Sequence, residues 1–267
     1  GWQMIVPSTA HPAFDKAATM FCVEIVRIPV HPQGHTDAFK ADVDGMINAI
    51  TSKTIFMAGS FPSFPHGMID PIDKLSDRLE DVDPQGKIGL HLDACLGGFC
   101  LPFINKSNAL AHLEMPIGFA NSRVTSISAD THKYGYDKKG SSIILYRDEE
   151  WYQHQIFTTT TWSGGIYTSP TFEGSRAGSN IATAWAVMTY LGTEKYVEAT
   201  EKIIITAQRI VARCQDHADI EILGNPQGMV VAFGSKNPEL NIYDVLEEIK
   251  EKGWYLSPLQ DPPAFHL

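Results

Sequence analysis

Short apolar runs alternate with helical patterns through the first 150 residues, and this alternation constrains the fold more than any other feature. Six runs are rich in apolar or β-branched residues and have the length of single strands: residues 4–6, 23–30, 54–58, 88–93, 124–128 and 142–146. Apolar residues at helical spacing lie between them, at Phe14, Ala17, Ala18 and Phe21 and again at Ile72, Leu75, Leu79 and Val82. The pattern predicts an α/β fold, with a mostly parallel sheet and helices on both faces.

The second half of the chain follows a different pattern. Residues 158–178 are rich in Thr, Ser and Gly and predict a long loop of the kind that carries function. Two helices are expected next, at 179–191 and from 194 to about 216. Strands at 220–223, 229–233 and 254–256 with a helix at 242–252 then suggest a small βαβ-like unit. We therefore expect a large domain over residues 1–216 and the start of a small α+β domain over 217–267.

The composition limits the kinds of molecule that the protein binds and the cellular compartment in which it is expected. The 267 residues are 43% hydrophobic, enough for a substantial core, and the net charge of −10 disfavours nucleic acid and anionic membranes as general partners. Four cysteines occur without a CxxC pair, which favours a reducing compartment over a disulfide framework. With no apolar run of about 18 residues and no signal-peptide pattern, the sequence predicts a soluble intracellular chain. No metal site is expected.

Two of the predicted strands end in residues that carry chemistry. The run at 87–92 is followed by Asp93, and the run at 124–127 is followed by a segment that contains His132 and Lys133. Carboxyl ends of parallel strands meet at one edge of a sheet, where open α/β sheets bind ligands. Pyridoxal phosphate needs this combination, because a lysine amine forms the Schiff base and a carboxylate keeps the pyridine nitrogen protonated. Taken singly, Asp93 could cap a helix and Lys133 could be a solvated loop residue; together they favour a pyridoxal phosphate site.

Beyond these residues, the chain resembles a known family along essentially its whole length. The segments 130–136 and 139–142 are similar to the sphingosine-1-phosphate lyases, which are fold-type I, pyridoxal-phosphate-dependent enzymes close to the group II amino-acid decarboxylases. The resemblance continues, in order, through residues 64–71, 91–99, 162–176 and 224–227. It implies a large pyridoxal-phosphate-binding domain and a retro-aldol cleavage of the C2–C3 bond of sphingoid base 1-phosphates. The products are a long-chain aldehyde and ethanolamine phosphate.

The resemblance also implies roles for individual residues. Lys133 would form the Schiff base, Asp93 would pair with the pyridinium, and His11 would stack on the cofactor ring. His132 would lie near the cofactor phosphate, and Lys139 near the phosphate of the substrate.

A further implication concerns oligomeric state. The loop that contains Gly174 and Ser175 resembles one that completes the active site of a neighbouring subunit, which implies a homodimer. Two alternatives stay open at this point. A group II amino-acid decarboxylase would share Asp93, His132 and Lys133, and an inactive relic of the lyase would keep the same residues.

One departure from the family concerns the cofactor phosphate. The family places a Gly/Thr-rich phosphate-binding turn well before the stacking histidine, but only ten residues precede His11 here. The chain is therefore expected to be a fragment that lacks an N-terminal segment and the extreme C-terminus, and to hold pyridoxal phosphate poorly by itself. The full-length protein is expected to be cytoplasmic or cytosol-facing, with an endoplasmic-reticulum anchor if it is eukaryotic.

Overall fold

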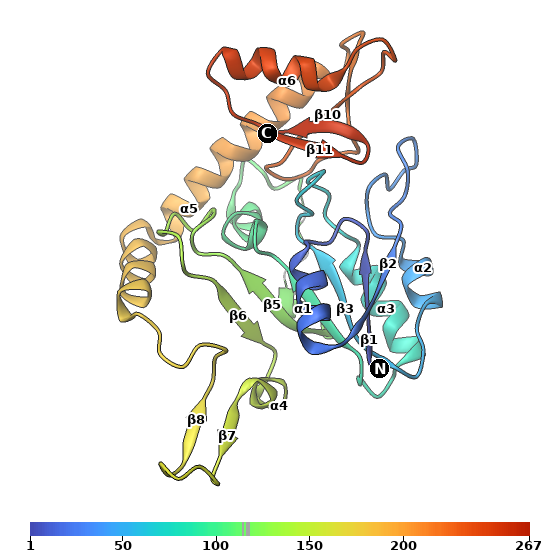
Figure 1. The fold of residues 1–267 in the computed structure, drawn as a ribbon. Helices are drawn as coiled ribbons and strands as arrows, with labels where there is room; N and C mark the ends of the chain where they lie inside the picture. The colour runs from blue at the N-terminus through green and yellow to red at the C-terminus, as the bar shows by residue number, and fades with distance from the viewer. Residues whose placement is uncertain (114, 116–117) are drawn as a thin grey trace.

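A central sheet organises the first 146 residues of the fold (Figure 1). The computed structural model describes residues 1–113, 115 and 118–267. Within these residues the sheet has six strands in the order β2-β1-β3-β4-β5-β6. Its strands are β1 (Gln3–Pro7), β2 (Glu24–Ile28), β3 (Thr54–Ser60), β4 (Gly89–Asp93), β5 (Val124–Ala129) and β6 (Ile143–Tyr146). All neighbours are parallel except β5 and β6. The prediction of a mostly parallel α/β sheet is confirmed.

Helices cover both faces of this sheet, as the sequence predicts. Helix α1 (Ala13–Phe21) lies on one face, and α2 (Val43–Asn48) and α3 (Ile72–Val82) lie on the other (Figure 1). Because successive side chains of a strand point to opposite faces, one strand contacts the helices on both sides of the sheet. In β3, Phe56 and Ala58 pack with α1, whereas Met57 is fully buried in the main core against α2 and α3.

Helix α2 is absent from the sequence prediction. Its six residues make fewer than two turns, too few for a helical period to be recognised. The side chain of Asp42 caps it by accepting a hydrogen bond from the Gly45 N–H at 3.0 Å. Further short elements were likewise not predicted: helix α4 (Glu149–Tyr152) and 3-10 helices at Gly97–Phe99, Leu101–Lys106, Gly118–Ala120 and Gln153–Gln155.

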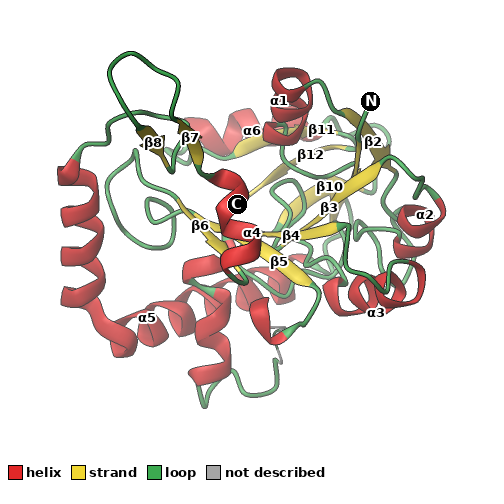
Figure 2. Ribbon diagram, turned by 90° about the horizontal axis from the view of Figure 1, so that it is seen from below, coloured by secondary structure: helices red, strands yellow, loops and turns green. Residues whose placement is uncertain are grey.

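A hairpin occupies much of the segment that was predicted as a loop. Strands β7 (Phe157–Thr159) and β8 (Tyr167–Ser169) pair antiparallel and stand out from the body of the molecule (Figure 1 and Figure 2). The loop prediction is wrong over these residues. Each strand has only three residues, too few to show an alternating pattern, and Gly165 at φ 104° supplies the turn between them.

Helix α5 (Gly178–Cys214) connects the hairpin side of the molecule to the small C-terminal unit (Figure 1). Gly192 interrupts it with φ 60° and ψ 177°, a conformation that glycine adopts without steric cost. The two helices predicted at 179–191 and 194–216 are therefore the two arms of this element. The second arm is anchored by Ile204, which is fully buried, and Ala207.

The small unit contains a four-stranded sheet in the order β11-β12-β10-β9. Its elements are β9 (Ile220–Ile222), β10 (Ala232–Ser235), α6 (Ile242–Glu251), β11 (Ser257–Gln260) and β12 (Pro263–His266). Every pair in this sheet is antiparallel, so the predicted βαβ-like arrangement is wrong. The predicted strand at 229–233 overlaps β10 only at its end.

The predicted strand at residues 254–256 is also wrong, because the strand begins at Ser257. The aromatic residues Trp254 and Tyr255 have strand propensity but are exposed. Prolines normally argue against a strand, yet Pro258 lies on the edge strand and Pro263 is the first residue of β12. Both positions tolerate the missing N–H.

A buried ion pair joins the end of α3 to the starts of β4 and β5, and it generates a stability prediction. Asp83 Oδ2 accepts hydrogen bonds from the Ile88 N–H at 2.8 Å and from Arg123 Nη2 at 3.0 Å. We expect Asp83→Ala to lower the free energy of unfolding by about 3 kcal/mol, because it leaves a buried guanidinium without its carboxylate. Urea unfolding measures this loss.

The matched control is Asp44→Ala, which removes the exposed partner of Arg78. The side chain of Asp44 is 57% exposed, and its loss should cost less than about 1 kcal/mol. Equal losses in the two variants would contradict the structural role of the Asp83–Arg123 pair.

Candidate active site

The carboxyl ends of β3, β4 and β5, together with the start of α1, surround a cavity of about 600 Å³. It lies on the α1 side of the sheet, beside the point where the strand order reverses at β2-β1-β3, the position at which open α/β sheets bind ligands. Its volume is within the range of small-molecule sites. Apolar side chains from Phe14, Leu96 and Ile144 form part of the wall. The polar lining residues are His11, Ser60, His91, Asp93, Ser128, Asp130 and Lys133.

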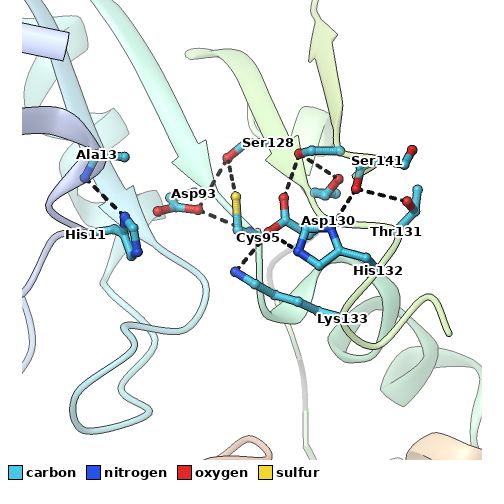
Figure 3. Close-up of polar contacts among 12 residues, drawn as sticks. His11, Ala13, Asp93, Cys95, Ser128, Asp130, Thr131, His132, Lys133 and Ser141 are labelled. Carbon is cyan, nitrogen blue, oxygen red and sulfur yellow. Dashed lines mark hydrogen bonds and ion pairs between the residues drawn. The ribbon is translucent and has the colours of Figure 1, made fainter. Parts of the chain in front are cut away.

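Asp93 is the last residue of β4 and presents a half-buried carboxylate to the cavity. Its Oδ1 atom accepts hydrogen bonds from the Cys95 N–H at 3.1 Å and from the Ser128 hydroxyl at 3.2 Å (Figure 3). Two donors on one oxygen fix the orientation of the carboxylate. The parallel register pairs Asp93 with Ser128 on β5, which is why a donor stands beside it.

Lys133 lies in the turn that follows β5. Its Nζ atom is 2.9 Å from Asp130 Oδ2, and the Ser142 hydroxyl donates to the other oxygen of Asp130 at 2.6 Å (Figure 3). Burial raises the pKa of the Asp130 carboxyl, but the hydrogen bond from Ser142 and the charge of Lys133 outweigh it and leave that pKa below its usual value. Asp130 is therefore an anion paired with the Lys133 amine.

His11 reaches the same cavity from the start of α1. Its Nδ1 atom accepts a hydrogen bond from the Ala13 N–H at 3.1 Å, which orients the ring at the beginning of the helix (Figure 3). The structure thus brings together three residues that the sequence places far apart: His11, Asp93 and Lys133 all line one cavity. The roles assigned to them from the resemblance stay predictions.

The other predicted site residues do not line this cavity. His132 is adjacent to it, but its Nδ1 atom lies 2.7 Å from the Ser141 carbonyl and therefore donates to that oxygen. Lys139 is exposed in the turn before β6, and Gly174 and Ser175 lie in the exposed segment between β8 and α5. Their proposed contacts with phosphate groups or a second subunit stay predictions.

Sequence reasoning missed several polar residues of the cavity. Asp130 precedes Lys133 by three residues, and this spacing was the available signal for their ion pair. Ser60, His91 and Ser128 gave no comparable signal. His91 lies inside a run that reads as buried strand, and Ser60 and Ser128 stand at strand ends where serine is common in turns.

The fold and the cavity define a class: an α/β protein whose ligand site, at the carboxyl edge of a parallel sheet, offers a lysine amine and a carboxylate. Residues 3–236 match the family model described as pyridoxal-dependent decarboxylase conserved domain. The chain belongs to that family.

Curated relatives extend the match over nearly the whole chain. The chain is 43% identical over 265 residues to sphingosine-1-phosphate lyase of Oryza sativa subsp. japonica, covering 99% of this chain and 47% of the relative. It is 42% identical over 265 residues to sphingosine-1-phosphate lyase 1 of Rattus norvegicus, covering 99% of this chain and 44% of the relative. The chain therefore spans about half the length of the curated relatives it matches.

Solved structures agree with the family assignment. The sphingosine-1-phosphate lyase of Burkholderia pseudomallei K96243 superposes with a TM-score of 0.91 at 38% identity, covering 100% of this chain and 58% of that one. Glutamate decarboxylase of Lactobacillus brevis superposes with a TM-score of 0.83 at 20% identity, covering 99% of this chain and 60% of that one, which shows a shared fold. The predicted fold class and the resemblance to the lyase family are confirmed.

The residues of the cavity fit pyridoxal phosphate, the cofactor of this family. Lys133 would provide an amine for the aldehyde, Asp93 would provide an oriented carboxylate for the pyridine nitrogen, and His11 would provide a flat ring at the cavity wall. The apolar part of the wall suits the faces of an aromatic cofactor. The cavity suits pyridoxal phosphate because an amine, a carboxylate and an imidazole ring line it together.

Proposed function

We propose that this chain carries the catalytic lysine and the cofactor-binding edge of a sphingoid base 1-phosphate lyase. The reaction breaks the C2–C3 bond of the substrate and releases a long-chain aldehyde and ethanolamine phosphate. The observation that carries the proposal is the convergence of His11, Asp93 and Lys133 in one cavity. It is supported by a similarity to sphingosine-1-phosphate lyases that covers 99% of the chain.

Three residues of the chain hold the cofactor in this proposal. Lys133 attaches it through Nζ, Asp93 keeps a proton on the pyridine nitrogen, and His11 stacks on the ring. When bound, pyridoxal phosphate supplies an electron sink for the pair released as the carbon–carbon bond breaks. His132 is assigned to the cofactor phosphate.

The protein must also move protons, because the C3 hydroxyl loses one as the aldehyde forms and C2 gains one. The Lys133 amine lines the cavity and would be able to carry a proton there when both cofactor and substrate are bound. Asp130, 2.9 Å from Nζ, holds that amine in place and balances its charge when it is protonated.

A homodimer is part of the proposal. The hairpin and the segment after it expose large apolar side chains, namely Phe157, Trp162, Ile166, Tyr167 and Phe172. A concentration of such residues on a projecting element is typical of a surface that another subunit covers. Gly174 and Ser175 adjoin this surface and are assigned to the site of the neighbouring subunit, and Lys139 to the phosphate of the substrate.

The proposed setting is the cytosolic side of the cell. The described cysteines Cys22, Cys95, Cys100 and Cys214 are all free, which supports a reducing compartment. Among the helices of the described residues, none has both the length and the apolar character needed to cross a membrane. An endoplasmic-reticulum anchor in a eukaryotic full-length protein stays a prediction.

The substrate class is tested by a direct comparison of reactions. We expect the full-length protein, supplied with pyridoxal phosphate, to release a fatty aldehyde from a phosphorylated sphingoid base and to release no carbon dioxide from amino acids. Lys133→Ala should abolish the aldehyde because the amine that binds the cofactor is gone. Decarboxylation of an amino acid without aldehyde release would assign the alternative function, a group II amino-acid decarboxylase.

Asp93→Asn tests the partner of the pyridine nitrogen separately from the lysine. The amide keeps the size of the side chain but loses the charge that holds the ring protonated, so turnover should fall by several orders of magnitude while the cofactor still binds. Turnover within about threefold of the unmodified protein would correspond to less than about 1 kcal/mol of barrier and would exclude this role.

A further inference from the structure

His91 is a buried histidine that the proposed mechanism does not use. It lies in β4, two residues before Asp93, and its ring packs against Phe14 and Phe56 at centroid distances of 6.1 Å and 5.8 Å. Burial lowers the pKa of His91 to about 4, and the nearby charge of Asp93 offsets only part of this shift. The imidazole is therefore neutral at pH 7 and carries one proton, on either Nδ1 or Nε2.

Both ring nitrogens have a serine hydroxyl as partner. Nδ1 lies 2.8 Å from Ser126 Oγ, and Nε2 lies 3.0 Å from Ser128 Oγ. Either tautomer satisfies these two contacts if the hydroxyls rotate accordingly. The choice between the tautomers therefore depends on what else the two serines bind.

Ser128 settles that choice because its hydroxyl has three partners and only one proton. Besides His91, its Oγ lies 3.2 Å from Asp93 Oδ1 and 3.3 Å from Cys95 Sγ (Figure 3). A carboxylate only accepts, so the serine proton must go to Asp93. Burial, together with the charge of Asp93, raises the pKa of the Cys95 thiol, which keeps its S–H as a donor to Ser128. Ser128 must then accept from His91 as well.

We propose that His91 is held as the Nε2–H tautomer and acts through Ser128 as a positioning residue for the Asp93 carboxylate. Ser126 donates to the free Nδ1 atom. The opposite tautomer would make Nε2 an acceptor that takes the proton of Ser128, and Asp93 would lose its side-chain donor. The proposal rests on the proposed function in one respect, namely that Asp93 is the partner of the pyridine nitrogen.

The hydrogen bonds at Asp93 show what this positioning would achieve at the cofactor site. Both donors, the Ser128 hydroxyl and the Cys95 N–H, bind Oδ1. Within the described residues no hydrogen bond is formed with Oδ2, so this oxygen is free to face a protonated ring nitrogen. The relay from His91 therefore directs the Ser128 proton to Oδ1, where it acts together with the Cys95 N–H to hold the carboxylate plane.

The tautomer is measured directly by ¹⁵N NMR of the protein labelled at histidine nitrogen, at pH 7 and without cofactor. The His91 signals are assigned by their loss in His91→Gln, and the cross-peak pattern between ring nitrogens and ring protons identifies the protonated nitrogen. We expect Nε2–H. In Ser128→Ala the proton should move to Nδ1, where Ser126 accepts it. In Ser126→Ala it should stay on Nε2.

Two NMR results would overturn the proposal: an Nδ1–H tautomer in the unmodified protein, or an Nε2–H tautomer that survives in Ser128→Ala. The effect on the site is read from the dissociation constant of pyridoxal phosphate. Loss of one charge-assisted hydrogen bond in Ser128→Ala should raise that constant about tenfold, while Ser126→Ala should change it less than about twofold.

An unchanged constant in Ser128→Ala would show that the relay does not position Asp93 for the cofactor. Failure of the proposed function gives a different result. If the full-length protein without substitutions bound no pyridoxal phosphate at all, the cofactor assignment would fail while the NMR test of the His91 tautomer would still be decided.

Discussion

The parallel pairing of β4 with β5 is the constraint on which the rest of the site depends. Its register places Asp93 opposite Ser128, and Lys133 follows five residues later in the turn after β5. Because side chains alternate along a strand, a slip of one residue would turn Ser128 to the other face and remove the donor from Asp93. This one register therefore fixes both the position of the Asp93 carboxylate and the position from which Lys133 reaches the cavity.

Two clusters of polar side chains lie at the carboxyl edge of the sheet, and each positions a different group. In one, the Ser128 hydroxyl and the Cys95 N–H bind Oδ1 of Asp93, and His91 and the Cys95 thiol contact the Ser128 oxygen. In the other, Asp130 is paired with Lys133, which keeps the amine at the cavity wall. Apolar side chains from α1 and β6 line the part of the cavity that lies beside both clusters.

Much of this arrangement follows from local sequence. The buried runs that became β4 and β5 are short and apolar, so their boundaries, and with them the strand-end position of Asp93, were predictable. The convergence of Asp93 with Lys133 needed only the general rule that parallel strands share a carboxyl edge. His11 was predicted as a site residue only from the family resemblance, and in the structure it lines the same cavity.

What the sequence did not predict depends on contacts between distant residues. The bonds of His91 to Ser126 and Ser128 exist only once β4 and β5 pair, so a histidine inside an apolar run gave no sign of them. The small antiparallel sheet was misread because Pro258 and Pro263 sit at strand positions that tertiary context makes tolerable.

Covalent capture of the cofactor tests the central claim most directly. The full-length protein is incubated with pyridoxal phosphate, reduced with borohydride and digested, and the modified peptide is identified by mass spectrometry. We expect the label on Lys133 and not on its exposed neighbours Lys138 and Lys139. A label on another lysine, or capture that persists in Lys133→Ala, would contradict the assignment of this cavity as the cofactor site.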